Sequence, residues 1–82
     1  MTVLVIGADE RLVVQALEQA GEDDQVIALE PSAAALERLV ENVRDPRLWF
    51  LIGDPEVVPL PDRSVDRVLG AEPSPELDRV SR

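Results

Sequence analysis

The chain has 82 residues, and its 8 basic residues, all arginine, face 17 acidic ones, so the formal net charge at pH 7 is −9. This length predicts one domain, and the negative charge argues against nucleic acids and anionic membranes as partners, because both select basic surfaces. Cysteine, histidine, lysine and tyrosine are absent, which excludes disulfides, cysteine metal sites and most common general bases and covalent nucleophiles. No apolar run approaches the roughly 18 residues of a membrane span, and we expect a cytoplasmic protein.

The first third of the chain alternates between strand and helix patterns. Val3 to Ile6 is a short apolar run that ends at Gly7, as in a parallel strand buried on both faces. From Asp9 to Ala20, apolar residues recur at helical spacing, and Gly21 stands where a helix C-terminal cap belongs. Gln25 to Leu29 is then expected to form a second strand.

The alternation continues after Pro31-Ser32. The expected helix has these apolar positions: Leu36, Leu39, Val40 and Val43. Asp45-Pro46 ends it, because proline disfavours helical backbone at the residue before it. Leu48 to Ile52 contains no polar residue and is predicted to be a third strand.

The last third is less regular. Gly53 to Ser64 contains three prolines, which leave little room for a helix. Val65 to Leu69 is the fourth expected strand. Ser74 followed by Pro75 predicts a helix N-terminus, and only a short helical stub follows it. Strands that alternate with helices in this way predict an α/β fold with a parallel sheet and right-handed crossovers.

Three stretches carry a family resemblance: V-L-V-I-G-A-D, V-I-A-L-E-P-S-A-A-A-L-E-R-L and L-I-G-D-P-E-V-V-P-L-P-D-R-S-V-D-R-V-L. Together they resemble the first half of a class I S-adenosylmethionine-dependent methyltransferase, from about Val3 to Leu69. The third stretch is the most specific, because Gly53-Asp54 and the turn from Pro61 to Asp66 repeat the family's approach to its fourth strand. The resemblance implies a minimal Rossmann-like sheet of four parallel strands in order 3-2-1-4, with two helices on one face and a short C-terminal helical stub.

The resemblance also implies three ligand-binding positions for S-adenosylmethionine. Glu30 stands where the family's acid accepts hydrogen bonds from the two ribose hydroxyls, and a carboxylate with two oxygens suits that task. Asp54 stands where an aspartate meets the adenine amino group. Gly7 occupies the first glycine of the ligand loop, where a tight turn leaves the strand. The alternatives are a strand-end acid at Glu30 and a simple turn aspartate at Asp54.

The ligand loop departs from the family pattern. Val5 replaces its acid, and Asp9 and Arg11 replace its second and third glycines. The acids Asp9 and Glu10 put negative charge at a helix start, where a pyrophosphate would otherwise be attracted. NAD, FAD and ATP are therefore not expected, whereas S-adenosylmethionine carries no phosphate and is weakened rather than excluded. Alternatively, the two acids simply cap the helix.

We expect residues 1–82 to form a single truncated methyltransferase-like domain, because the resemblance implies that family members continue with further helices and strands that build the acceptor pocket. We therefore expect a domain that is non-catalytic on its own and that acts as a self-associating or partner-binding module with at most weak adenosyl-ligand binding. One alternative is a small methyltransferase subunit that binds S-adenosylmethionine and works with another chain. A second is a phospho-receiver-like acidic pocket in which Asp9, Glu10 and Asp54 hold magnesium.

A homodimer is expected from the topology. Both helices cover one face of the sheet, and the other face receives only the proline-rich loop and the stub. Val57, Val58 and Leu60 are expected to cover part of that second face but hardly all of it. The fourth strand is expected to be an open edge. The dimer would form by antiparallel pairing of two fourth strands or by packing of the two half-covered faces.

Overall fold

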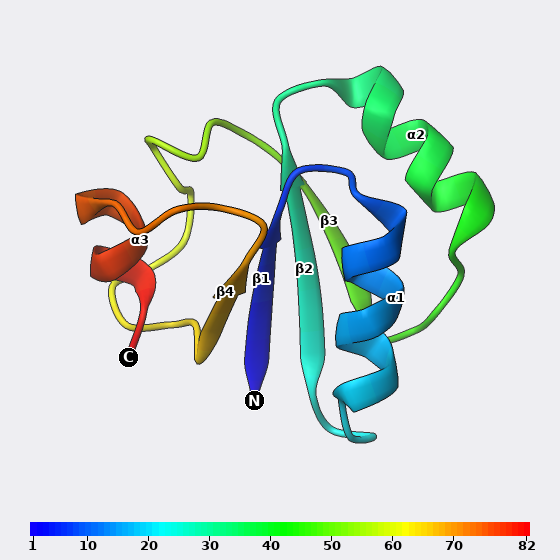
Figure 1. The fold of residues 1–82 in the computed structure, drawn as a ribbon, viewed down its shortest axis with the longest axis horizontal. Coiled ribbons are helices and arrows are strands. Elements are labelled where there is room, and N and C mark those ends of the chain that lie inside the picture. Colours follow the sequence, from blue (N-terminus) through cyan, green and yellow to red (C-terminus); the bar gives the residue numbers. More distant parts are fainter.

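The structure, a computed structural model that describes residues 1–82, is a four-stranded parallel sheet in the order β3-β2-β1-β4 with three helices (Figure 1). The strands are β1 Thr2–Ile6, β2 Gln25–Glu30, β3 Leu48–Ile52 and β4 Arg67–Leu69, and the helices are α1 Glu10–Gln19, α2 Ala33–Asn42 and α3 Pro75–Val80. The expected fold class, strand order and C-terminal stub are confirmed.

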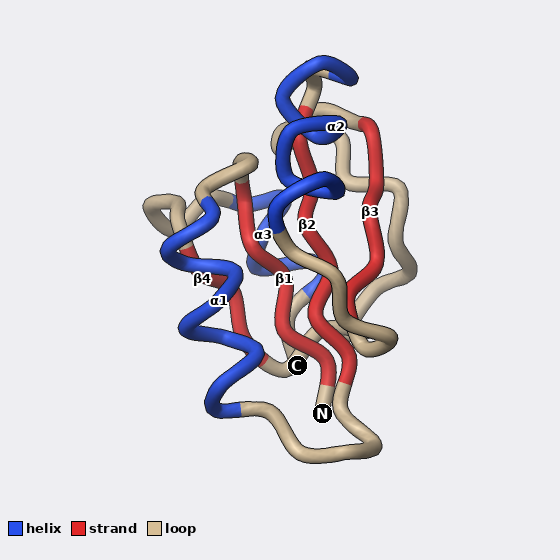
Figure 2. The backbone as a smooth tube through the Cα atoms, turned by 90° about the vertical axis from the view of Figure 1, so that its right-hand side faces the viewer, coloured by secondary structure: helices blue, strands red, loops and turns tan.

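One face of the sheet is covered by α1 and α2, which lie on the same side of the strands in Figure 2. Alternate residues of β1 and β2 point to this face, as the pleat of a strand requires. The buried residues of this first cluster are Val3, Val5, Val13, Ala16, Leu17, Val26, Ala28, Leu36, Leu39, Val43 and Leu48. The predicted amphipathic helices therefore supply most of this core, although Val40, expected among its apolar positions, is 42% exposed.

The opposite face is sealed over its centre by the proline-rich segment and by α3. Leu4 and Leu29 project there from β1 and β2 and are fully buried. The second cluster consists of Leu4, Leu29, Val58, Val65, Leu77 and Val80, with Leu60 partly buried against it. The cover is complete over Leu4 and Leu29, whereas Ile27 of β2 is only partly buried and lines a surface groove with Trp49, so the expectation of a partial cover holds at that place. Val57 contributes nothing to the cover, because it is 72% exposed.

The side chain of Arg79 holds this second layer together. It donates to both carboxylate oxygens of Glu76, at 2.7 and 2.9 Å, and to Asp62 at 2.6 Å. It also donates to the carbonyls of Val58 at 2.8 Å and Leu60 at 3.1 Å. The planar guanidinium has donors in several directions, so one residue of α3 fixes the loop that precedes β4.

Helix α1 ends differently from the expectation. Its C-cap is Ala20, and Gly21 is not among the glycines with positive φ, so no left-handed cap forms. Instead, the Gly21 N–H donates to the Asp24 carboxylate at 2.8 Å, and the Arg47 guanidinium donates to the Ala20 carbonyl at 2.8 Å. The side chain of Arg47, which directly precedes β3, therefore satisfies a carbonyl at the end of α1 in place of a glycine cap.

Strand β4 is shorter than the expected Val65–Leu69 and begins at Arg67. Val65 lies next to Ser81 in an isolated parallel bridge. Its N–H donates to the carbonyl of Val80 at 2.8 Å, and its carbonyl accepts from Arg82 at 2.9 Å. The backbone of Val65 thus pairs with the C-terminal residues rather than extending β4 against β1.

Candidate functional site

Gly7 and Glu30 come together at the carboxyl ends of β1 and β2. Gly7 has a φ of 96°, a conformation that favours glycine, and its N–H donates to the carbonyl of Leu29 at 2.7 Å. A Cβ atom at Gly7 would lie 3.8 Å from Oε2 of Glu30. The turn off β1 therefore passes close to the carboxylate of Glu30, as the interpretation of these residues as one site requires.

The carboxylate of Glu30 keeps acceptor capacity for a ligand. The residue is half-buried at the end of β2, and its Oε1 accepts one hydrogen bond, from the Ser32 N–H at 3.3 Å. No group of the protein donates to Oε2, the oxygen beside Gly7. A carboxylate has about four lone-pair directions, so Glu30 can accept two further hydrogen bonds from a pair of hydroxyls.

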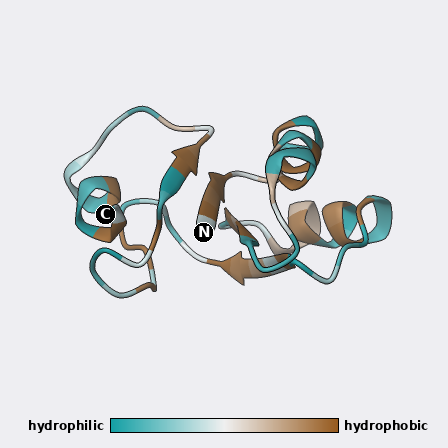
Figure 3. Ribbon diagram, turned by 90° about the horizontal axis from the view of Figure 1, so that it is seen from below, coloured by the Kyte–Doolittle hydropathy of each residue, from teal (hydrophilic) through white to brown (hydrophobic).

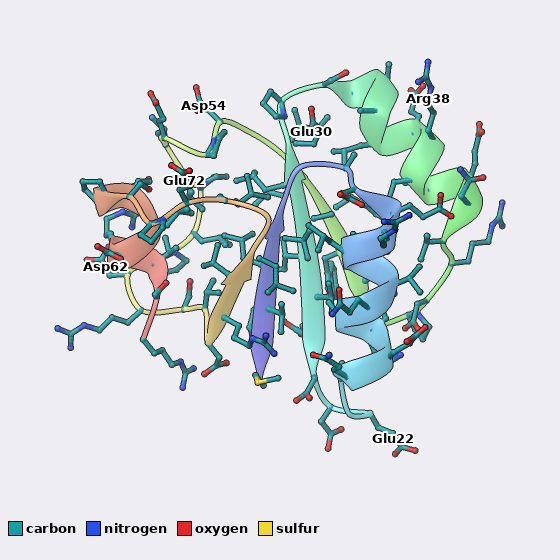
Figure 4. All side chains as sticks on the ribbon, in the orientation of Figure 1. Glu22, Glu30, Arg38, Asp54, Asp62 and Glu72 are labelled. Carbon is teal, nitrogen blue, oxygen red and sulfur yellow. The ribbon has the colours of Figure 1, made fainter.

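Asp54 follows β3 at the same carboxyl end of the sheet, and its side chain is exposed (Figure 4). Its Oδ1 accepts the Glu56 N–H at 2.8 Å, and its carbonyl accepts the Val57 N–H at 3.0 Å. The turn interpretation of Asp54 is therefore confirmed for one carboxylate oxygen, and the other oxygen remains available. No hydrogen bond joins Asp54 to Glu30 or Gly7.

Asp9 caps helix α1. Its Oδ1 accepts from the backbone N–H groups of Arg11 at 3.0 Å and Leu12 at 3.3 Å. These are the donors that an anion at the helix start would use, and Asp9 already occupies them. The capping interpretation is confirmed for Asp9. The magnesium pocket proposed for Asp9, Glu10 and Asp54 does not form, because no three acidic residues of the chain are grouped to hold a metal ion.

Two glycines at the carboxyl end of the sheet have steric roles that the sequence interpretation missed. Gly70 follows β4 with a φ of 85°, and a Cβ atom there would lie 2.7 Å from the carbonyl oxygen of Ile6. At Gly53, a Cβ atom would lie 3.0 Å from Cδ1 of Leu29. Both glycines directly follow a predicted strand, and this position could have indicated a close approach of the backbone. They let the chain pass close to β1 and β2 at the candidate site.

The site is an open surface rather than a cleft. None of the grooves on the molecule is lined by Gly7, Glu30 or Asp54. Ligand pockets in proteins usually bury most of a small molecule. A ligand held by these three residues would therefore stay largely exposed to water on these 82 residues. None of the three helices has the length and the apolar character that a membrane-spanning helix needs.

The comparisons with known proteins agree with the fold. A methyltransferase domain family model matches residues 4–78. A candidate S-adenosyl-L-methionine-dependent methyltransferase of Methanococcus maripaludis superimposes with a TM-score of 0.78 at 21% identity, over 99% of this chain and 43% of that one. A SAM-dependent methyltransferase of Aquifex aeolicus gives 0.76 at 24% identity, over 100% of this chain and 51% of that one.

A third solved structure is a complex between a Haloferax volcanii methyltransferase activator and a candidate methyltransferase, with a TM-score of 0.68 and 27% identity over 82% of this chain and 29% of that one. The chain thus spans about half or less of the length of these proteins. No curated protein matches it. Because the family model covers almost all of the chain and the sheet has the expected order, the chain belongs to the class I S-adenosylmethionine-dependent methyltransferase family.

Proposed function

We propose that this domain binds the adenosyl part of S-adenosylmethionine weakly, does not transfer the methyl group by itself, and acts in association with another polypeptide. The observation that carries the proposal is the approach of Gly7 to Glu30, where a Cβ atom would lie 3.8 Å from Oε2. Glu30 would accept hydrogen bonds from the two ribose hydroxyls, and the available oxygen of Asp54 would accept one from the adenine amino group.

Weak rather than tight binding follows from the loop. The side chains of Asp9 and Arg11 stand where the family has glycines, so the backbone cannot approach the ligand as closely. The Asp9 carboxylate also occupies the N–H groups at the start of α1. An exposed ligand gains less from the exclusion of water, which further limits the affinity.

The absence of methyl transfer by the isolated domain follows from what these 82 residues hold at the site. Histidine, lysine, tyrosine and cysteine are absent, which removes the usual bases for an acceptor. No groove of the domain is lined by Glu30, so these residues form no pocket that would hold an acceptor at the reacting distance. Residues outside these 82 would have to supply these elements, and in the small-subunit alternative a partner chain does so.

We infer that association with another chain uses a different strand from the one expected from the sequence. The flank of Val65, just before β4, is taken by the C-terminal residues, and α3 covers the second face. Strands β3 and β4 are the two edges of the sheet, and β3 is the one that exposes large apolar side chains, so it is the edge for association with another chain, whether a second copy, as expected from the sequence, or a different protein. The Haloferax volcanii methyltransferase bound to its activator supports a complex with a different protein.

Isothermal titration calorimetry with S-adenosylmethionine and its demethylated product tests the ligand site. We expect a dissociation constant well above micromolar, and Glu30→Ala should weaken binding by about 1–3 kcal/mol, because ligand hydroxyls lose their acceptor. Glu22→Ala is the matched control, since Glu22 is exposed and lies at the opposite end of the sheet (Figure 4). A submicromolar constant would contradict weak binding, and equal affinity in Glu30→Ala would contradict the ribose assignment.

Methyl transfer is tested with radiolabelled S-adenosylmethionine and a panel of small acceptors. The purified domain should give no turnover. Repeated turnover on any acceptor would overturn the non-catalytic part of the proposal and leave the ligand site intact.

A further inference from the structure

Strand β3 is an apolar edge strand with little cover. Trp49 is 57%, Phe50 37% and Ile52 61% exposed, although the strand contains no polar residue and no proline. Natural proteins usually protect such edges with charges, prolines or a covering segment, because the open backbone can pair with another strand. None of these devices is present on β3.

The backbone of β3 also has free hydrogen-bonding groups. Arg47 C=O accepts from Val26 N–H at 2.9 Å, and Gly53 N–H donates to Glu30 C=O at 3.2 Å. Because every second residue of a parallel strand bonds to the same neighbour, the N–H and C=O groups of Phe50 and Ile52 point away from β2. An added strand would find these groups unpaired.

A groove lies on each side of this strand. On the α2 side, a groove of about 400 Å³ is lined by Leu36, Glu37, Val40, Glu41, Phe50 and Ile52. On the opposite side, one of about 340 Å³ is lined by Gln25, Ile27, Trp49, Leu51 and Leu60. An added strand would place alternate side chains in the two grooves, which is the recognition mode of strand addition. Figure 3 shows the mainly hydrophobic ribbon of the strands beside helices whose ribbon alternates between hydrophobic and hydrophilic residues.

The charges of the two grooves differ. Glu37 and Glu41 are the polar residues of the α2 groove, and Gln25 is the polar residue of the other; neither groove contains a basic residue. Long basic side chains can lay their methylene stems on Val40 and Ile52 and carry their charge to the two glutamates. A second copy would bring the same acids and another net charge of −9 to the contact, which opposes self-association.

We propose that β3 is the docking edge for an extended basic segment of a partner protein, with arginine or lysine facing α2 and apolar side chains facing Leu60. This inference rests on the proposed function only in that the domain associates with another polypeptide. It does not depend on the adenosyl-ligand site, so calorimetry with S-adenosylmethionine and the following experiment can fail independently.

The test uses the fluorescence of Trp49, the one tryptophan of the chain. The probe is a capped ten-residue peptide of alternating valine and arginine, and its control alternates valine and glutamate. The basic peptide should shift the emission to the blue and saturate, and the acidic peptide should bind at least about tenfold more weakly. Saturable binding of both peptides with equal affinity would overturn the charge argument, and the absence of any shift would overturn the docking edge.

Two pairs of variants locate the contact. Ile52→Pro removes an outward N–H and should weaken the basic peptide at least about tenfold, whereas Ile52→Thr should keep most of the affinity. Glu37→Arg with Glu41→Arg should reverse the preference toward the acidic peptide. Glu10→Arg with Glu18→Arg on α1 gives the same change in net charge on exposed residues and should leave the preference unchanged. If the α1 pair reverses it equally, the groove is not the site; these pairs decide the question even if Ile52→Pro fails to fold.

Light scattering coupled to size exclusion distinguishes a second copy. The domain alone should elute as a 9.0 kDa monomer at micromolar concentration. A dimer that is lost in Ile52→Pro and retained in Ile52→Thr would show that a second copy occupies β3, which overturns the basic partner.

Discussion

The two edge strands of the sheet, β3 and β4, differ in how far other segments of the chain cover them. Beside β4, the chain returns on itself: Val65 pairs with Val80 and Arg82 through backbone hydrogen bonds of 2.8 and 2.9 Å. Beside β3 nothing returns, and Trp49 and Ile52 are more than half exposed. Apolar composition therefore did not decide which strand is covered. What decided it was where the segments distant in sequence come to lie.

The covering of the two faces of the sheet explains this difference. The segment after β3 and helix α3 lie over β1 and β2, where they bury Leu4 and Leu29 completely. Helix α2 covers the first face of β3 only in part, because Val40 is 42% exposed beside Phe50. We therefore expect substitutions in the second cluster, which α3 and the proline-rich segment cover, to lower the free energy of unfolding much more than substitutions of exposed residues on β3.

The largest expected effect comes from Leu77→Ala in α3. Leu77 is 5% exposed in the second cluster, and emptying such a site typically costs about 2–5 kcal/mol in the free energy of unfolding. Urea denaturation followed by circular dichroism measures it. Val57→Ala, at a residue 72% exposed, is the control and should change stability by less than about 0.5 kcal/mol. Equal effects of the two substitutions would mean that α3 does not close the sheet.

Gly70→Ala at the end of β4 should have the next largest effect. The residue has a φ of 85°, and a Cβ atom would lie 2.7 Å from the Ile6 carbonyl. Left-handed strain alone costs about 1–3 kcal/mol, and the contact adds to it. Gly21→Ala is the matched glycine control, because Gly21 lacks a positive φ and its new Cβ would lie 3.4 Å from the nearest atom, on Asp24. Thermal unfolding compares the two, and an unchanged melting temperature in Gly70→Ala would contradict the close approach.

Acidic pH should lower the free energy of unfolding, because it protonates Glu76 in α3, which covers the second cluster. The Arg79 side chain, and then the Val58 N–H, hold the pKa of Glu76 below its usual value of 4.5. A folded-state pKa that is depressed stabilises the protein above the unfolded value, and this contribution is lost as the pH falls below about 4.5. Urea midpoints at pH 7 and pH 3 should therefore differ less in Arg79→Gln than in the parent chain. An equal difference in both proteins would contradict the role of this pair.

Protonation of a second carboxylate, that of Asp45 at the turn that leads into β3, should also lower the stability of the protein in acid. The Arg47 guanidinium, with help from its backbone N–H, lowers the pKa of Asp45 to about 2. Its contribution is present above the usual value of 3.8 and is lost as the pH falls toward about 2. Arg47→Gln should remove this component and leave the contribution of Glu76 in place. Urea midpoints at pH 7 and pH 2, compared between Arg47→Gln, Arg79→Gln and the parent chain, separate the two carboxylates.

The smallest expected effect is that of Ile52→Thr on the open edge. Ile52 is 61% exposed, and threonine keeps the branched shape that suits a strand. The free energy of unfolding should change by less than about 0.5 kcal/mol. A loss of more than about 2 kcal/mol, comparable with a cavity in the core, would show that β3 is covered in solution and would remove the contrast between the edges.

Much of the fold could be predicted from local patterns. The strands, the helices and the caps at Asp9 and Ser74 follow from residues within one or two turns of each other. The order of the sheet followed from the family resemblance. For the candidate site, the positions of Gly7 and Glu30 at strand ends were enough to place both residues at the carboxyl end of a parallel sheet.

The sequence by itself did not predict how the second face closes. The Arg79 side chain reaches the Val58 carbonyl, 21 residues away, and Val65 pairs with the C-terminal residues. Such contacts depend on how the loop and α3 pack, and no periodic pattern contains that information. The sequence determined that β3 is apolar and that β4 follows a turn. Only the tertiary structure decided that β3 is the edge strand with exposed apolar side chains, because burial depends on segments that are remote along the chain and adjacent in space.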